Sequence, residues 1–262
     1  MPLLSIITVC KNPGFSIAET VNSVITQPFK DYEYIVVDSL SSDGTTEYLQ
    51  TLKSKKKINK LIVEKDQGIY EAINKGISAS EGDYIGIIHA GDTYRKKIFS
   101  LLSPYFNNKI DILYGSAHII HEEDINYVNL KKNSHWELKK RNSIIHTSTF
   151  VKKKLYHEIG LYNEKFIIAG DYEFFKKSLD KKINFFQVPF SISNIQFGGI
   201  STRIDFLNTS TKECTQIIFG NNFSLNKFKY FINYFFTNFF SLIKKKIANE
   251  IRLFKEMFYQ SF

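Results

Sequence analysis

The chain has 262 residues, 43% of them hydrophobic, and 35 Lys and Arg against 26 Asp and Glu give it a net charge of +9. This length and composition predict one large domain with an appendage and argue against extended disorder. The two cysteines, Cys10 and Cys214, exclude a disulfide framework and a CxxC zinc site. The sequence contains no run of 18 apolar residues, so we expect no ordinary transmembrane helix.

The first predicted element is an apolar strand over residues 3–9, buried on both faces. This segment lacks the basic region and cleavage site of a signal peptide, so we expect the domain to be cytoplasmic. Ser16 and Glu19 then have the spacing of a helix-capping box, and an apolar helical stripe follows. Further buried strands, with helices between them, are expected at 33–38, 60–65, 84–92 and 111–116.

This alternation predicts an α/β fold with a mainly parallel central sheet flanked by helices. In such sheets, ligands bind beyond the carboxyl ends of the strands. Asp38, Asp66 and Asp92 lie at or just after three of these ends. We therefore expect acidic side chains to line a binding site there.

Beyond residue 116 the alternation weakens. Residues 120–145 are polar and charged, and we expect them to form an irregular excursion over the site. A helix over 171–180 has Asp171 near its start, and 184–202 supply a strand or two and a Gly-Gly loop. The chain has no GxGxxG or GxxxxGK[ST] phosphate loop, no GxSxG elbow and no HExxH motif.

Five segments occur in a distinctive order, and they are SIITVCKN, YIVVDSLSSDGT, EKDQGIYEAINKGI, GDYIGIIHAGD and IAGDYEFF. Together they resemble the family 2 glycosyltransferases, which have the nucleotide-sugar-binding GT-A fold, over roughly residues 3–202. The third segment resembles enzymes that make bacterial surface polysaccharides of the colanic acid, O-antigen or capsule type. The resemblance implies a GT-A fold and a nucleotide-sugar donor.

The resemblance implies donor contacts for five residues. Asp38 is expected to bind the nucleobase, since a carboxylate can accept the imide N–H of uracil; the alternative is an acid that caps the next loop. Asp43 matches a second family acid, although Asp-Gly is also a common turn pair. Asp66 resembles a residue that contacts the nucleoside, with a surface turn as the alternative. Asn74 is expected to hydrogen-bond near the donor, and Lys75 either offsets phosphate charge or is an ordinary exposed lysine.

Asp92 is the candidate metal ligand. A divalent ion that bridges both phosphates stabilises the charge of the leaving group, and oxygen ligands suit Mn²⁺ or Mg²⁺. The sequence HAGD at 89–92 departs from the fullest family pattern, which has acids earlier in the motif. We expect His89 to be a buried strand-end histidine rather than a metal ligand.

Asp171 matches the catalytic base of the family, which takes the proton of the attacking acceptor hydroxyl. The alternative is an acid favoured by the helix macrodipole, and both can hold. His146 resembles a histidine of related polysaccharide enzymes that lines the acceptor side or contacts the donor phosphates, with a core histidine as the alternative. Gly198 and Arg203 follow the last strand and are expected to hold the diphosphate, unless this segment is a plain flexible loop.

The C-terminal part has a different composition. Residues 223–262 contain thirteen aromatic residues, seven Lys and Arg and two Glu. Apolar residues recur there at three- and four-residue steps, which predicts amphipathic helices at a membrane surface or in a homodimer interface. The spaced apolar residues are Ile232, Phe236, Phe239, Ile243, Ile247, Ile251, Phe254 and Phe258. We therefore expect a catalytic domain over 1–215 and a helical region over 216–262.

Taken with the resemblance, these features predict an inverting, metal-assisted transferase. It is expected to move a sugar from a nucleotide donor, UDP-linked by preference, to a lipid-linked bacterial surface glycan. The enzyme is expected at the cytoplasmic face of the cell membrane, with no nucleic-acid partner. The alternative is a non-catalytic, membrane-associated glycan-assembly or glycan-binding protein that keeps the fold.

Overall fold

The computed structural model describes residues 1–107, 109–121, 124–128, 133–199, 203–222, 224–240 and 243. The chain divides into two compact units, residues 1–197 and 198–262. This division lies earlier in the chain than the domain boundary expected after residue 215.

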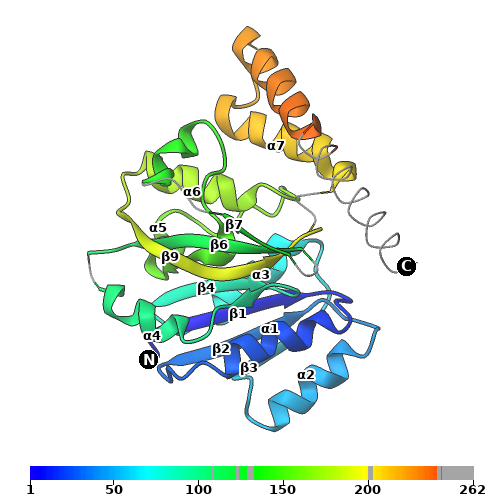
Figure 1. Ribbon diagram of the computed structural model, residues 1–262, viewed down its shortest axis with the longest axis vertical. Helices are drawn as coiled ribbons and strands as arrows, with labels where there is room; N and C mark the ends of the chain where they lie inside the picture. The colour runs from blue at the N-terminus through cyan, green and yellow to red at the C-terminus, as the bar shows by residue number, and fades with distance from the viewer. Residues whose placement is uncertain are drawn as a thin grey trace, which may run out of the picture. The chain divides into compact units, whose positions relative to one another are not determined.

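Four parallel strands form one half of the central sheet of the first unit (Figure 1). Their order is β3 (Lys60–Val63), β2 (Tyr32–Asp38), β1 (Leu4–Cys10) and β4 (Tyr84–His89). Every residue of β1 is buried, as its uninterrupted apolar sequence predicts for a central parallel strand.

Three helices connect these strands: α1 (Ser16–Ile25), α2 (Thr45–Ser54) and α3 (Ile69–Ala79). Ile6 of β1 belongs to the same core cluster as Val21 and Val24 of α1. The next residue, Ile7, contacts Gly76 of α3 so closely that a Cβ on that glycine would lie 2.6 Å from Ile7 Cγ2. Because neighbouring strand residues point to opposite faces, α1 and α3 cover opposite faces of the sheet.

The other half of the sheet is mixed. After β4 it continues with β8 (Thr149–Lys152), β6 (Ile112–His121), β9 (Phe185–Gln196) and β5 (Thr93–Tyr94), and β7 (Asp124–Val128) pairs with β6. The pairings give β6 and β9 the direction of the first four strands, whereas β5, β7 and β8 run the other way. The expected α/β fold with a mainly parallel sheet is confirmed.

The expectation that residues 120–145 form an irregular excursion is wrong in part. Strand β6 continues to His121, and β7 returns antiparallel along it. The long pairing of β6 with β9 on its other side supplies hydrogen bonds that the polar sequence does not reveal.

The remaining helices of the first unit are short except for α6 (Gly170–Asp180). The short helices are α4 (Ile98–Leu102), α5 (Lys154–Glu158) and the 3₁₀ turns η1 (Ser103–Tyr105), η2 (Ser134–Lys139) and η3 (His146–Ser148).

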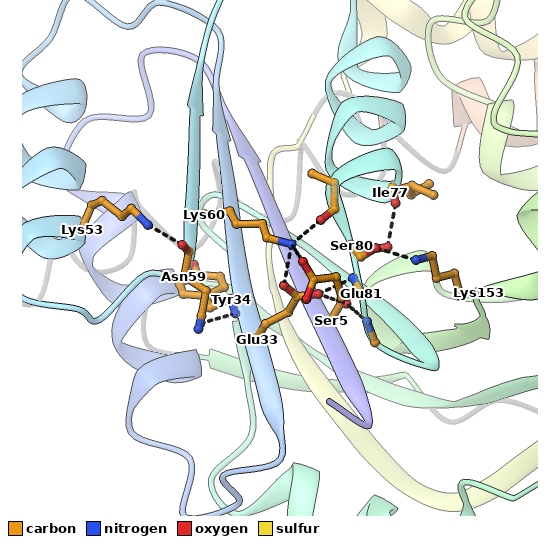
Figure 2. Close-up of polar contacts among 12 residues, drawn as sticks. Ser5, Glu33, Tyr34, Lys53, Asn59, Lys60, Ile77, Ser80, Glu81 and Lys153 are labelled. Carbon is orange, nitrogen blue, oxygen red and sulfur yellow. Dashed lines mark hydrogen bonds and ion pairs between the residues drawn. The ribbon is translucent and has the colours of Figure 1, made fainter. Parts of the chain in front are cut away.

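A polar network occupies the amino ends of β1, β2 and β3 (Figure 2). The buried carboxylate of Glu33 accepts hydrogen bonds from Ser5 Oγ at 2.6 Å and from the Glu81 backbone N–H, and it pairs with Lys60 at 3.2 Å. Lys60 also donates to the Ala79 carbonyl at 2.7 Å. We call this cluster the amino-edge network.

The second unit contains η5 (Ile204–Phe206), α7 (Leu207–Phe219) and a helix over 225–240. Cys214 Sγ lies 3.5 Å from Tyr234 Oη, which joins the two helices. Among the described residues, no helix is long and apolar enough to span a membrane.

Candidate active site

Two loops at the carboxyl ends of β1 and β2 are tied together by hydrogen bonds. Asn12 N–H donates to Ser41 Oγ at 2.8 Å, and Ser42 N–H donates to Asn12 Oδ1 at 2.7 Å. Asp43 Oδ2 accepts the Gly14 N–H at 2.7 Å, and its other oxygen accepts the Thr45 N–H at 3.2 Å. The predicted acid Asp43 therefore fixes the β1–α1 loop against the β2–α2 loop.

Asp38 ends β2 with its side chain fully buried. Its Oδ1 accepts hydrogen bonds from Ser41 N at 3.1 Å and Ser41 Oγ at 2.5 Å, and Oδ2 accepts one from Thr46. Cys10 Sγ lies 3.8 Å from Oδ1. Asp38 thus caps the loop that follows β2, which is the alternative that the sequence left open. Its contact with a nucleobase stays a prediction.

Asp66 follows β3 and differs from the two preceding acids. Its Oδ2 is buried and has no hydrogen-bond partner in the part of the chain that the structure describes. A buried carboxylate oxygen is normally satisfied by a donor, and leaving it unpaired costs free energy. Asp66 is therefore poised to accept a hydrogen bond from a ligand.

Asn74 and Lys75 of α3 are occupied within the protein. Asn74 Nδ2 donates to the Tyr162 carbonyl and to Glu164 Oε1, both at 2.9 Å, and Asn74 Oδ1 accepts the Tyr162 N–H at 3.0 Å. Lys75 Nζ donates to the Lys65 carbonyl at 2.7 Å and pairs with two glutamates, Glu64 and Glu71. These contacts hold loops around the site, and the predicted contacts of Asn74 and Lys75 with the donor stay predictions.

Asp92 is placed by the turn after β4. Thr20 Oγ1 of α1 accepts the Gly91 N–H at 2.9 Å and donates to the Asp92 carbonyl at 2.8 Å. Gly91 has a φ of +99°, which favours glycine at this position. Asp92 Oδ1 accepts the Gln196 N–H of β9 at 3.0 Å, and burial raises the pKa of the Asp92 carboxyl to about 7.

The fit of a divalent ion to these side chains is limited. Within the described residues, no group of three or more His, Cys, Asp or Glu side chains could hold a metal ion. Asp92 offers one carboxylate whose Oδ2 makes no hydrogen bond to the described residues. Mg²⁺ and similar ions are often held by one or two carboxylates together with substrate phosphates, and Asp92 fits such a site but not an all-protein one.

Asp171 lies at the start of α6 and is buried. Its Oδ1 accepts the Tyr172 N–H at 2.8 Å and lies 3.4 Å from Tyr70 Oη, and its Oδ2 accepts a hydrogen bond from Asn142 Nδ2 at 3.2 Å. Burial raises the pKa of this carboxyl, and the hydrogen bonds from Tyr172 and Asn142 partly oppose that rise. A raised pKa at a positioned carboxylate is typical of a general base or acid.

Tyr70 and Asn142 were not singled out from the sequence. Tyr70 Oη donates to the Ile168 carbonyl at 2.6 Å and accepts the Asp171 N–H at 3.3 Å. A Cβ on Gly170 would lie 2.8 Å from the Tyr70 ring, so glycine is needed there. Nothing in the local pattern reveals these contacts, because Tyr70 and Asp171 are 101 residues apart.

A ring cluster lies beside Asp171. His89 and His146 have ring centroids 5.4 Å apart, and His146 Nε2 lies 3.0 Å from Tyr162 Oη. Burial lowers the pKa of His146 to about 4 and that of His89 to about 3. His146 therefore packs within this cluster of rings. Its predicted contact with the acceptor or with the donor phosphates stays a prediction.

Gly198 and Arg203 belong to the second unit. Gly198 has a φ of +101°, and Arg203 pairs with Asp205 at 2.9 Å and lies over the Phe206 ring at 5.4 Å. Their predicted contact with a diphosphate stays a prediction.

The first unit therefore gathers Asp66, Asp92 and Asp171 at the carboxyl ends of parallel strands and at a helix start. The family model of glycosyl transferase family 2 matches residues 5–183. The chain belongs to glycosyl transferase family 2. The resemblance to the family 2 glycosyltransferases is thereby confirmed.

Two of the curated relatives have names that state what they help to synthesise. TuaG of Bacillus subtilis, named as a teichuronic acid biosynthesis glycosyltransferase, is 34% identical over 36% of this chain and 38% of its own length. A PGL/p-HBAD biosynthesis glycosyltransferase of Mycobacterium bovis is 23% identical over 78% of this chain and 80% of its own. An uncharacterized glycosyltransferase of Rickettsia conorii is 29% identical over 67% of this chain and 31% of its own length. The chain thus spans about a third of the Bacillus and Rickettsia relatives.

Solved structures of low sequence identity share the fold. S. aureus TarS 1-349 in complex with UDP-GlcNAc superimposes with a TM-score of 0.68 at 17% identity, covering 90% of this chain and 73% of TarS 1-349. The mannosyltransferase PcManGT of Pyrobaculum calidifontis, in complex with GDP-Man and Mn2+, gives a TM-score of 0.61 at 15% identity over 89% and 68% of the two chains. The expected GT-A architecture is confirmed by this likeness.

Proposed function

We propose that this chain is an inverting glycosyltransferase that moves a sugar from a UDP-sugar to a hydroxyl of a bacterial surface glycan. The observation that supports this most is that Asp66 and Asp92 follow the carboxyl ends of β3 and β4, while Asp171 of α6 contacts Tyr70 at the start of α3. Asp66 has a buried, unpaired oxygen, and burial raises the pKa of the other two acids. Perturbed acids gathered at a ligand-binding edge are typical of an active site.

The donor nucleoside is assigned to the loops after β1, β2 and β3. Asp43 and Asp38 set the shape of the first two loops through internal hydrogen bonds. Asp66 Oδ2 then accepts a hydrogen bond from the nucleoside, which removes the penalty of an unpaired buried oxygen. UDP is favoured because TarS, which shares the fold, is known in complex with UDP-GlcNAc.

The diphosphate is assigned to the turn that ends in Asp92. A bound Mn²⁺ or Mg²⁺ would offset the negative charge that develops on the leaving diphosphate. Asp92 Oδ2 would be the protein ligand for such an ion, and the Gln196 N–H holds the opposite oxygen so that the side chain stays oriented.

Asp171 is the proposed catalytic base. The acceptor oxygen attacks the anomeric carbon, the bond from that carbon to the phosphate oxygen breaks, and the hydroxyl proton moves to Asp171. Attack opposite the leaving diphosphate inverts the anomeric configuration. Burial raises the pKa of Asp171, which strengthens it as a base, and Asn142 and the Tyr172 N–H hold its two oxygens in place.

A lipid-linked acceptor agrees with an exposed apolar stripe on the helix over 225–240. Five large side chains on it have exposed fractions between 39% and 63%, and they are Leu225, Phe228, Ile232, Phe236 and Phe240. Phe239, also predicted to lie on this stripe, is half-buried and stacks on Phe235. Of the other predicted stripe residues, Ile247, Ile251, Phe254 and Phe258 lie outside the described residues.

The stripe is assigned to an anionic membrane surface, with a homodimer as the alternative. Exposed aromatic residues at three- and four-residue steps favour an interfacial helix. Co-sedimentation with vesicles containing phosphatidylglycerol tests this assignment. The variant carries both Phe228→Ser and Phe236→Ser. Loss of sedimentation in the variant supports the assignment, whereas a dimer that the same variant dissociates supports the alternative.

The reaction itself is tested by nucleotide release. The full chain is incubated with UDP-GlcNAc, UDP-glucose, UDP-galactose and GDP-mannose, with Mn²⁺, with Mg²⁺ and with a chelator. We expect UDP release from at least one UDP-sugar, increased by the ion. Failure to release or bind any nucleotide would instead support a non-catalytic glycan-binding protein.

A further inference from the structure

His89 ends β4, in the turn that leads to Asp92, and its ring packs against His146. The backbone carbonyl of His89 accepts the Asp92 N–H at 3.0 Å, so His89 and Asp92 close the turn that follows β4. Asp171 is close enough for its charge to act on His89, and the reverse also holds. The space between the proposed diphosphate site and the proposed base therefore borders this ring.

His89 also has an unsatisfied polar atom. Its Nδ1 is buried and has no hydrogen-bond partner among the described residues. The ring packs against His146, whose Nε2 is itself bonded to Tyr162 Oη at 3.0 Å. A polar atom held unpaired in this way costs free energy in the unliganded protein.

The unpaired Nδ1 of the imidazole calls for a hydrogen-bonding partner from outside the described residues. A neutral imidazole offers one N–H donor and one acceptor nitrogen, which matches a hydroxyl group rather than a phosphate. Asp92 and Asp171 already supply the acidic groups of this region, so the imidazole suits an uncharged part of the donor.

We propose that His89 Nδ1 hydrogen-bonds a hydroxyl group of the pyranose that is transferred. This assignment rests on the proposed function, because it needs the diphosphate at Asp92 and the acceptor oxygen at Asp171. A sugar whose anomeric carbon lies between these two points has its ring against His89. The residue thereby contributes to the choice among donor sugars, whereas UDP alone does not reach it.

The decisive variant is His89→Phe, which keeps a flat ring against His146 and removes the unpaired nitrogen. A merely structural histidine predicts unchanged binding. A sugar-binding histidine predicts a thermal midpoint equal to or above that of the wild type, with unchanged affinity for UDP. It also predicts about tenfold weaker binding of UDP-GlcNAc, UDP-glucose or UDP-galactose, whichever the wild type prefers, and a similar loss in kcat/KM.

His89→Asn serves as the matched control, because its amide restores a hydrogen-bonding group near the position of Nδ1. It is expected to keep most of the sugar affinity that His89→Phe loses. If His89→Phe does not fold, His89→Leu takes its place, with the same tenfold deficit expected relative to His89→Asn.

The outcomes separate the two proposals. Equal binding of UDP-sugars by the wild type and the apolar variant overturns the assignment of His89 and leaves the proposed function intact. A wild-type protein that binds neither UDP nor any UDP-sugar overturns both.

Discussion

Buried polar and charged side chains have complete sets of partners at the amino edge of the parallel half-sheet and incomplete sets at the carboxyl edge. At the amino edge, Glu33 is buried but receives hydrogen bonds from Ser5 and the Glu81 N–H and an ion pair from Lys60. Although burial raises its pKa, these partners lower the pKa of Glu33 below its ordinary value. Its charge is thus stabilised within the protein.

At the carboxyl edge the partners are incomplete. Asp66 Oδ2 and His89 Nδ1 are buried without hydrogen-bond partners among the described residues, and burial raises the pKa of Asp92 to about 7. Both edges are built from strands of the same sheet, so the difference does not come from the fold class. Unsatisfied groups are expected where a ligand completes them, and satisfied groups where stability alone is served.

The largest effect is expected from Asp171→Asn. It removes the proposed base while the amide keeps the size of the side chain, so transfer should fall by about 10³-fold. Donor affinity, measured by calorimetry with UDP-GlcNAc or the preferred UDP-sugar, should change little. Turnover near the wild-type rate would show that another group takes the proton.

Asp66→Ala is expected to weaken UDP binding by about 10- to 100-fold, because a hydrogen bond to a charged group is lost. The free energy of unfolding should be unchanged or higher, since an unpaired buried oxygen is removed. The matched control is Asp83→Ala, an exposed acid just before β4. Equal UDP affinity in both variants would contradict a ligand contact at Asp66.

Glu33→Ala should affect stability and leave UDP affinity unchanged. It leaves Ser5 and the Glu81 N–H without their acceptor and is expected to cost about 3 kcal/mol in the free energy of unfolding. Glu81→Ala, in the same network but with a side chain 62% exposed, should cost less than about 1 kcal/mol. Urea denaturation at neutral pH measures both.

The pH dependence of this stability follows from the lowered pKa of Glu33. A group with a lowered folded-state pKa stabilises the protein above its unfolded pKa, and that stability is lost as pH falls. The difference between wild type and Glu33→Ala should therefore shrink as pH falls below the ordinary value of 4.5. A difference that stays constant to low pH would show that packing, not charge, is responsible.

The smallest effect is expected from Asn142→Ala. Asn142 donates to Asp171 Oδ2 and so opposes the rise in its pKa that burial causes. Because the base acts when ionised, the acid limb of kcat should move to higher pH in the variant. Glu173→Ala, on the same helix α6, is the control and should leave the limb in place.

The sequence predicted the strands well because their apolar runs are buried on both faces, as for β1. Because these apolar runs define where each strand ends, the sequence also placed Asp38, Asp66 and Asp92 at or just after strand ends. It could not predict that Asp38 is satisfied by Ser41 and Thr46 while Asp66 is not, because neighbouring loop geometry decides this. Spacing reports where an acid lies but not what surrounds it.

Long-range contacts account for the other differences. The partners of Asn74 lie 88 and 90 residues away, so an amide that looked available is used to hold the 162–164 loop. Pairing of β6 with β9 likewise extends a strand into a segment whose polar sequence predicted irregular structure. In each case tertiary packing overrides the local pattern.

Hydrogen exchange with and without UDP and Mn²⁺ tests the contrast between the two edges most directly. Ligand should slow exchange in the loops at 10–16, 38–46, 64–69 and 89–93, and leave the amino-edge network around Glu33 and Lys60 unchanged. Protection confined to the amino edge, or no protection at the carboxyl edge when UDP is bound, would contradict the placement of the donor site.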